Sequence, residues 1–166
     1  MYYGKTTNKK VRNATVCRAD GIEFKSKLEM FCYLYFKSEN LMLKYEQDHT
    51  VIMHGFNTGD KVNVWIRRKT TGSNEYHLRK SKAFLDMVYT PDFSLMAGED
   101  IFYIETKGMA NDAYPLRRKM FIANLVKQAD ELGCRFHFFE PHTKAEVIET
   151  CEIIKSIMNQ NGKETN

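Results

Sequence analysis

The spacing of hydrophobic residues divides the chain into short α- and β-type segments. Apolar residues recur at helical spacing between Leu28 and Tyr35, which predicts that residues 22–41 form an amphipathic helix that stops near Glu39 or Asn40. Residues 44–53 favour a strand in their β-branched second half. The first part of the chain is therefore expected to form a helix followed by a strand.

Helix and strand alternate in the C-terminal third of the chain. Residues 115–132 carry apolar residues along one helical face, with Pro115 suited to the first helical turn and Gly133 suited to the helix end. The apolar sequence RFHFFE that follows predicts a short strand. Thr143 and Glu146 then form a capping-box pattern at the start of a last helix.

The middle of the chain contains two adjacent strands and a less regular segment. Residues 82–95 and 101–108 have the pattern of strands joined around the sequence AGED, whereas residues 54–82 mix turn-like and basic stretches and predict a hairpin or a long excursion. The order of elements indicates an α/β chain with a small mixed sheet covered by helices.

Length and composition suit one compact domain over residues 1–166, with a basic arm at residues 1–15. The formal net charge of +4 is compatible with a nucleic-acid partner without demanding one. No apolar run approaches the roughly 20 residues of a membrane span. The four cysteines are scattered and suggest reduced thiols, so we expect a cytoplasmic protein without a membrane partner.

Polar residues interrupt the two adjacent strands in an unusual way. Asp92 follows a proline next to one apolar run, and Glu105 and Lys107 lie two residues apart in the other, so that their side chains point to the same face of a strand. Converging carboxylates repel each other, and Lys107 offsets only one of them. A hard divalent cation would offset both, and oxygen ligands suit Mg²⁺ or Mn²⁺.

These residues also resemble a known signature. The pattern Pro91-Asp92 with Glu105-Thr106-Lys107 is similar to that of the PD-(D/E)XK nucleases, and the runs YTPDF and ETKG resemble those of phage endonuclease I-type Holliday junction resolvases and related phage nucleases. The resemblance covers roughly residues 22–139, and the segment 54–82 is longer than in that family. It implies a restriction-endonuclease-like core.

The resemblance implies roles for individual residues. Asp92 and Glu105 would be catalytic metal ligands together with the Thr106 backbone carbonyl, and Lys107 would be the catalytic lysine. Glu29, in the sequence FKSKLE, would be the outlying acid of the catalytic and metal site. Two plainer interpretations stay open: a solvated Glu–Lys pair on a strand face, and a capping box in which Glu29 reaches back to the Ser26 N–H.

The same resemblance implies an activity. We expect a metal-dependent endodeoxyribonuclease of phage type that hydrolyses DNA phosphodiester bonds with Mg²⁺ (Mn²⁺ as a substitute), acts on branched DNA such as Holliday junctions, works as a homodimer and resides in the host cytoplasm. The alternatives are a restriction-type or general DNA-processing nuclease and a non-catalytic DNA-binding module.

Basic clusters supply the candidate DNA contacts. Such clusters are also common on solvated faces, and that alternative stays open for each of them. The candidates are Arg117, Arg118 and Lys119 at the start of the helix after the ETKG strand, and Arg67, Arg68, Arg79 and Lys80 in the excursion.

Overall fold

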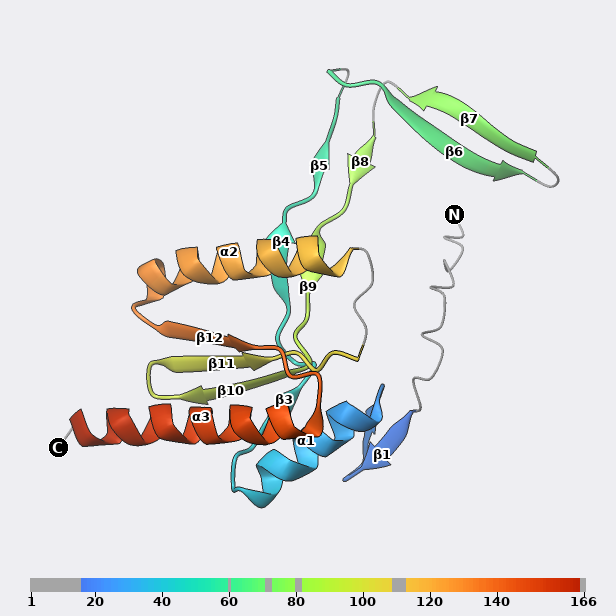
Figure 1. Ribbon diagram of the computed structural model, residues 1–166. Helices are drawn as coiled ribbons and strands as arrows, with labels where there is room; N and C mark the ends of the chain where they lie inside the picture. Colours follow the sequence, from blue (N-terminus) through green and yellow to red (C-terminus); the bar gives the residue numbers. More distant parts are fainter. Residues whose placement is uncertain (1–15, 60, 71–72, 80–81, 109–112, 165–166) are drawn as a thin grey trace.

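The fold is a small mixed β-sheet between helices, with a long β-hairpin extending from it (Figure 1). The computed structural model describes residues 16–59, 61–70, 73–79, 82–108 and 113–164. The proposed N-terminal arm at 1–15 lies outside these residues. The helices are α1 (Lys27–Ser38), α2 (Tyr114–Leu132) and α3 (Lys144–Glu164). No helix in the described part of the chain is long and apolar enough to cross a membrane.

The central sheet has four strands in the order β12-β11-β10-β3. Its strands are β3 (Lys44–Tyr45), β10 (Phe93–Ala97), β11 (Asp100–Ile104) and β12 (Arg135–Phe139). Strands β3, β10 and β11 pair antiparallel, and β12 adds to β11 in parallel because α2 carries the chain back between them. The expected α/β class with a small mixed sheet is confirmed.

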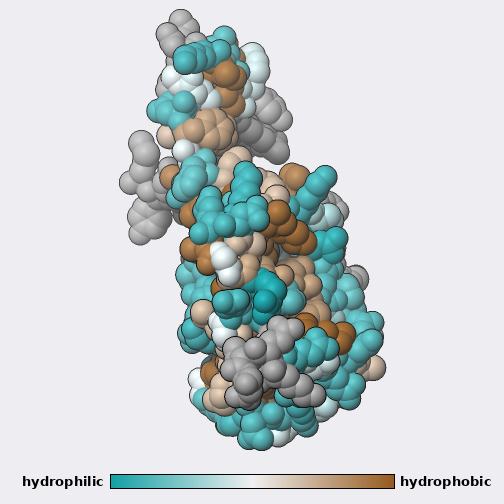
Figure 2. Space-filling model, turned by 90° about the vertical axis from the view of Figure 1, so that its left-hand side faces the viewer, coloured by the Kyte–Doolittle hydropathy of each residue, from teal (hydrophilic) through white to brown (hydrophobic). Residues whose placement is uncertain are grey.

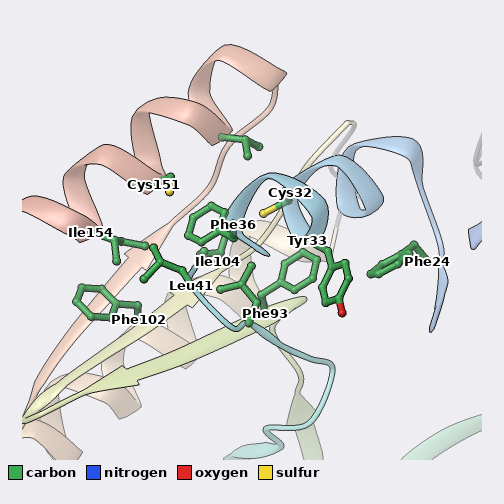
Figure 3. Packing of buried hydrophobic residues seen from close by; sticks show 12 residues of the cluster. Phe24, Cys32, Tyr33, Phe36, Leu41, Phe93, Phe102, Ile104, Cys151 and Ile154 are labelled. Carbon is green, nitrogen blue, oxygen red and sulfur yellow. The ribbon is translucent and has the colours of Figure 1, made fainter. Parts of the chain in front are cut away.

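Both faces of the sheet are covered. On one face Phe93, Phe102 and Ile104 are fully buried against residues of α1 and α3 such as Phe36 and Val147 (Figure 3). On the other face α2 packs through Phe121, and the Tyr89 ring stacks on Phe121 at 4.4 Å between centroids. The two cores hold the strands between α2 and the α1–α3 pair (Figure 1).

The first helix begins later than the sequence pattern suggested. Residues 22–24 form β2 (Ile22–Phe24), which pairs antiparallel with β1 (Cys17–Ala19). The turn between them is Asp20-Gly21, with positive φ at both residues, as a type I′ hairpin turn requires. The helix starts only after Ser26, whose hydroxyl accepts from the Glu29 N–H at 3.1 Å. The prediction of a helix over the whole of 22–41 was therefore wrong at its N-terminal end.

The later helix boundaries follow local chemistry. Helix α2 ends at Gly133, which adopts the left-handed conformation with φ 64°. The capping box before α3 is present: Glu146 N–H donates to Thr143 Oγ1, and Thr143 N–H donates to the Glu146 carboxylate, each at 3.2 Å. Both helix boundaries match the sequence patterns.

The described residues between 50 and 89 form one long antiparallel hairpin, and this segment is here called the β arm. Three ladders follow one another along it. They are β4 (Thr50–Met53) with β9 (Met87–Tyr89), β5 (Phe56–Asn57) with β8 (Ala83–Phe84), and β6 (Val64–Thr70) with β7 (Ser73–Arg79). The arm passes α2 and rises from the body as a narrow projection (Figures 1 and 2). The segment 54–82 singled out in the sequence lies within it.

Candidate functional site

Strand register brings the two candidate carboxylates together. Strands β10 and β11 pair Phe93 with Ile104, so Asp92 and Glu105 are the next opposed residues where the hairpin opens. The Asp92 N–H donates to Glu105 Oε2 at 3.3 Å. Glu105 is only 5% exposed. The convergence expected from the hairpin is present in the structure.

The neighbouring residues hold the two carboxylates in place. Asp92 Oδ2 accepts from both the backbone N–H and the hydroxyl of Thr106, at 2.8 Å each. Lys107 Nζ lies 2.6 Å from Glu105 Oε1. The N–H groups of Glu105 and Lys107 donate to carbonyl groups at and beyond the end of β12, which continues the parallel ladder and fixes this backbone. Asp92, Glu105 and Lys107 thus lie just beyond the ends of β10 and β11, where these hydrogen bonds hold the backbone.

Burial and like charge perturb Asp92. Removal from water raises the pKa of its carboxyl, the Glu105 and Glu29 carboxylates raise it further, and the bonds from Thr106 only partly oppose this. The result is a pKa of about 7. The protein alone therefore does not fully compensate the negative charge of the site.

Glu29 lies beside this pair and also caps α1. Its Oε2 accepts from the backbone N–H of Lys25 at 2.9 Å and from the Tyr45 hydroxyl at 2.8 Å. The expected cap partner was the Ser26 N–H, but the carboxylate bonds to the N–H one residue further back. Because Glu29 also raises the pKa of Asp92, it is both a cap and a neighbour of the site.

Two further charged residues at the site were not found by sequence reasoning. The Glu46 N–H donates to the Asp92 carbonyl at 2.9 Å, which places Glu46 on the other side of Asp92 from Glu105. The Glu46 carboxylate pairs with the Lys25 ammonium. Burial opposes the charge on Lys25, but the bond to Glu46 and the nearby Asp92 and Glu29 carboxylates raise its pKa overall. Neither residue belongs to a recognisable motif, although Glu46 has an uncommon positive φ of 46°.

The donor set suits a hard divalent cation. The neighbourhood contains four carboxylates (Glu29, Glu46, Asp92 and Glu105) and two ammonium groups (Lys25 and Lys107), which leaves a formal charge of −2 when all are ionised. Among the described residues, no three His, Cys, Asp or Glu side chains are arranged as a ready metal cage. Mg²⁺ commonly uses one or two carboxylates and keeps several waters, so Asp92 and Glu105 would suffice as its side-chain ligands.

A small open cavity adjoins the pair. It has a volume of about 120 Å³, and Tyr89, Thr90, Glu105, Lys107, Tyr114 and Arg117 line it. The Arg117 guanidinium, from the first turns of α2, donates to the Val88 carbonyl at 2.6 Å and is held at the rim. Cationic and hydroxyl groups thus face a space next to the carboxylates, which is what an anionic group such as a phosphate requires.

A network from α2 and β12 positions Lys107. The Lys107 ammonium lies 4.0 Å above the centroid of the Tyr114 ring, and the Tyr114 hydroxyl donates to Glu140 Oε2 at 2.8 Å. Arg118 Nη1 donates to the same oxygen at 2.6 Å. Burial opposes ionisation of Glu140, yet these bonds lower its pKa overall, while burial and the bond to Glu140 raise the pKa of Tyr114.

The candidate DNA contacts are divided between two places. Arg117 lines the cavity, Arg118 is tied to Glu140, and Lys119 is exposed on α2. Arg67 and Arg68 lie on β6 and Arg79 on β7, where the structure describes the backbone alone, and Lys80 lies outside the described residues. The carboxylates and Lys107 therefore meet in one site, whereas the arginines of the β arm belong to a separate element.

Comparisons with known proteins add no relative. No protein-family model matches the sequence, and no significant match was found among curated proteins or solved structures. The function is therefore inferred from the chemistry of the site.

Proposed function

We propose that this protein is a metal-dependent endodeoxyribonuclease that hydrolyses DNA phosphodiester bonds with Mg²⁺. The observation that carries the proposal is that Asp92 and Glu105 lie opposite each other at the ends of two neighbouring strands, with Lys107 bonded to Glu105 at 2.6 Å. A solvated Glu–Lys pair would not explain the burial of Glu105 or the raised pKa of Asp92. A cation-binding catalytic site explains both.

Each residue has a defined task in this proposal. Asp92 and Glu105 hold the cation, with the Thr106 carbonyl as the further ligand that the resemblance implies. When bound, Mg²⁺ would polarise a phosphoryl oxygen and lower the pKa of a bound water. Thr106 keeps the Asp92 carboxylate oriented through its two hydrogen bonds.

The cations at the cavity act on the phosphate. Lys107 is held between Glu105 and the Tyr114 ring, where its ammonium would stabilise the attacking oxygen and the charge that develops on the phosphoryl group. Arg117 at the rim would bind a non-bridging oxygen. Water adds to phosphorus and the bond to the 3′ oxygen breaks, which leaves a 5′-phosphate and a 3′-hydroxyl, as the resemblance implies.

The same proposal extends to the type of core, the DNA substrate, the oligomeric state and the place of action. A restriction-endonuclease-like core is supported by a hairpin that carries the charged residues, an adjoining parallel strand and a crossover helix. By resemblance to the phage resolvases, we propose branched DNA as substrate, a homodimer that cuts two strands symmetrically, and the host cytoplasm as the place of action.

Cleavage of supercoiled plasmid and of a synthetic four-way junction tests the activity. We expect products with Mg²⁺ or Mn²⁺ and none with EDTA. Glu105→Ala and Lys107→Ala should each lower the cleavage rate at least a hundredfold and leave DNA binding largely intact. Glu131→Ala and Lys127→Ala, at exposed positions of α2, are the matched controls and should cut like the wild type.

The outcome separates the rival interpretations. Wild-type rates in both site variants would overturn the nuclease proposal. Binding of DNA without metal-dependent products on junction, flap, duplex or single strand would favour the non-catalytic binding module. Cleavage of linear duplex as fast as of the junction would favour a restriction-type or general nuclease.

A further inference from the structure

The positive charge of the chain is concentrated in two segments of the sequence. Within residues 50–89 the sequence has seven Lys or Arg and three Asp or Glu, a formal charge of +4. Residues 1–15 have four basic and no acidic residues, again +4. The remaining residues, 16–49 and 90–166, have 14 basic and 18 acidic residues, a charge of −4. The β arm is therefore a cationic element attached to an acidic body.

The arm is a two-stranded ribbon with exposed apolar side chains. Trp65 is 65% exposed, Leu85 is 82% exposed and Phe56 is 50% exposed. An isolated hairpin of two strands is at best marginally stable in water, since it has no core of its own. An arm of this kind is expected to gain its stability from a surface that covers it.

The neck of the arm is well defined. The Phe56 and Phe84 rings stack at 5.0 Å between centroids, and the Lys82 ammonium lies 4.6 Å above the Phe84 ring. The Gly55 N–H donates to Asp86 Oδ1 at 2.6 Å, and a Cβ at Gly55 would lie 2.6 Å from the Phe84 carbonyl oxygen. Close packing at this point fixes the direction in which the ribbon leaves the body.

The root of the arm is also a wall of the candidate active site. Strand β9 ends at Tyr89, and Tyr89 and Thr90 line the cavity beside Glu105. The Arg117 guanidinium bonds to the Val88 carbonyl on the same strand. A polyanion with one phosphate in the cavity is therefore already in contact with the base of the arm.

We propose that the β arm is a duplex-DNA-binding ribbon that grips the DNA beyond the phosphate at the active site. This inference rests on the proposed function, because that function makes DNA the ligand of the cavity. The major groove of B-DNA admits a two-stranded β-ribbon, and lysine and arginine side chains on it supply phosphate contacts. A second copy of the chain is the competing occupant, since its body is acidic.

The reach of the arm predicts how binding depends on DNA length. The seven residues of β6 alone extend about 23 Å at about 3.3 Å per residue, which is roughly seven base pairs of B-DNA. The ladders between β6 and the body add to this distance. A short duplex centred on the cavity cannot contact the whole length of the arm, whereas a long duplex can.

The test measures binding without cleavage, in Glu105→Ala protein and without divalent cations. The variant Arg67→Gln/Arg68→Gln/Arg79→Gln removes three charges from the arm, and Arg18→Gln/Lys127→Gln/Lys144→Gln removes three from exposed positions of the body. On a 36-base-pair duplex the arm variant should bind at least tenfold more weakly, and its log K against log salt slope should become shallower by about two to three. The body variant should change affinity less than threefold, and the arm variant should lose little on a 12-base-pair duplex.

The single tryptophan gives a readout that needs no change in the arm. Trp65 lies in β6, so its emission and its quenching by acrylamide should change when the long duplex is added. Equal affinities of the arm and body variants for the long duplex would overturn the inference. Trp65 emission that stays unchanged at saturating DNA would also overturn it. A Trp65 emission that changes with protein concentration in the absence of DNA would overturn it as well, because a second copy of the chain would then be what covers the arm. None of these results depends on cleavage, so the nuclease proposal stands or falls separately.

Discussion

The backbone N–H of Asp92 donates to Glu105 Oε2 at 3.3 Å, across the open end of the β10–β11 hairpin. One hydrogen bond thus joins the Asp92 backbone to the Glu105 carboxylate, and the proposed chemistry depends on both residues. Burial of Asp92, together with repulsion from the Glu105 and Glu29 carboxylates, raises the pKa of its carboxyl to about 7. Stability and activity should therefore respond in opposite directions to changes at this pair.

Replacing Asp92 by asparagine should stabilise the metal-free protein. The substitution removes a buried negative charge, and the asparagine oxygen can still accept from Thr106. We expect a gain of about 2 kcal/mol in the free energy of unfolding at pH 8, measured by urea denaturation with EDTA, and at least a hundredfold slower cleavage with Mg²⁺. Glu131→Gln is the control and should change neither. A less stable Asp92→Asn protein would contradict the proposed repulsion.

Metal binding should depend on pH through Asp92. A carboxyl whose folded-state pKa is raised destabilises the metal-free fold as pH rises from about 4 to about 7, because the folded protein then holds a proton that the unfolded chain has lost. Mg²⁺ must displace that proton below pH 7 and relieves the repulsion above it. The increase in Tm caused by 10 mM Mg²⁺ should therefore be larger at pH 8 than at pH 6. An equal increase in Tm at both pH values, or the same increase in Asp92→Asn, would show that the stabilising Mg²⁺ does not bind at Asp92.

Tyr114 should act as a positioning residue for Lys107. Its ring lies under the ammonium at 4.0 Å, a contact typically worth about 0.5–2 kcal/mol. Tyr114→Leu should lower kcat roughly three- to thirtyfold, whereas Tyr114→Phe keeps the ring and should lose less. The split between kcat and KM separates positioning from simple destabilisation, because a displaced Lys107 would lower kcat while KM and the free energy of unfolding stay close to the wild-type values. Equal losses in the two variants would point to the hydrogen bond to Glu140 instead.

Glu29 can be tested separately as a cap and as part of the site. Glutamine retains an oxygen for the Lys25 N–H and the Tyr45 hydroxyl but has no charge. We expect Glu29→Gln to leave thermal stability within about 1 kcal/mol and to lower cleavage at least tenfold. Glu29→Ala should lower both. Full activity in Glu29→Gln would assign Glu29 to the helix cap alone.

The opposite end of the sheet should control acid stability and not activity. Asp100 is fully buried and accepts two bonds from Arg135 at 2.9 Å and one contact from His137 at 2.7 Å. The Arg135 bonds, with His137, lower its pKa to about 2, although burial opposes this. The contribution of ionised Asp100 to the free energy of unfolding is therefore complete above about pH 4 and is lost as pH falls through 2. Asp100→Asn should cost about 2 kcal/mol at pH 7 in urea unfolding, with cleavage per folded molecule unchanged.

Local patterns predicted some boundaries and missed others for identifiable reasons. The capping box at Thr143 and the stop at Gly133 are formed by residues within a few positions of each other, so the sequence was enough to find them. The hairpin before α1 was missed because apolar spacing was weighed above the Asp20-Gly21 turn signal. In that hairpin the local turn decides between strand and helix.

The sequence by itself determined that Asp92 and Glu105 would lie opposite each other, because the short turn sets the register of the β10–β11 hairpin and both residues stand at its open end. Only the tertiary structure decided what surrounds them. Glu29 comes from the first turn of α1 and Lys25 from the segment just before it, Glu46 follows β3, and Tyr114 comes from α2. Their approach depends on the packing of both faces of the sheet, a property of contacts between distant segments that no local spacing encodes.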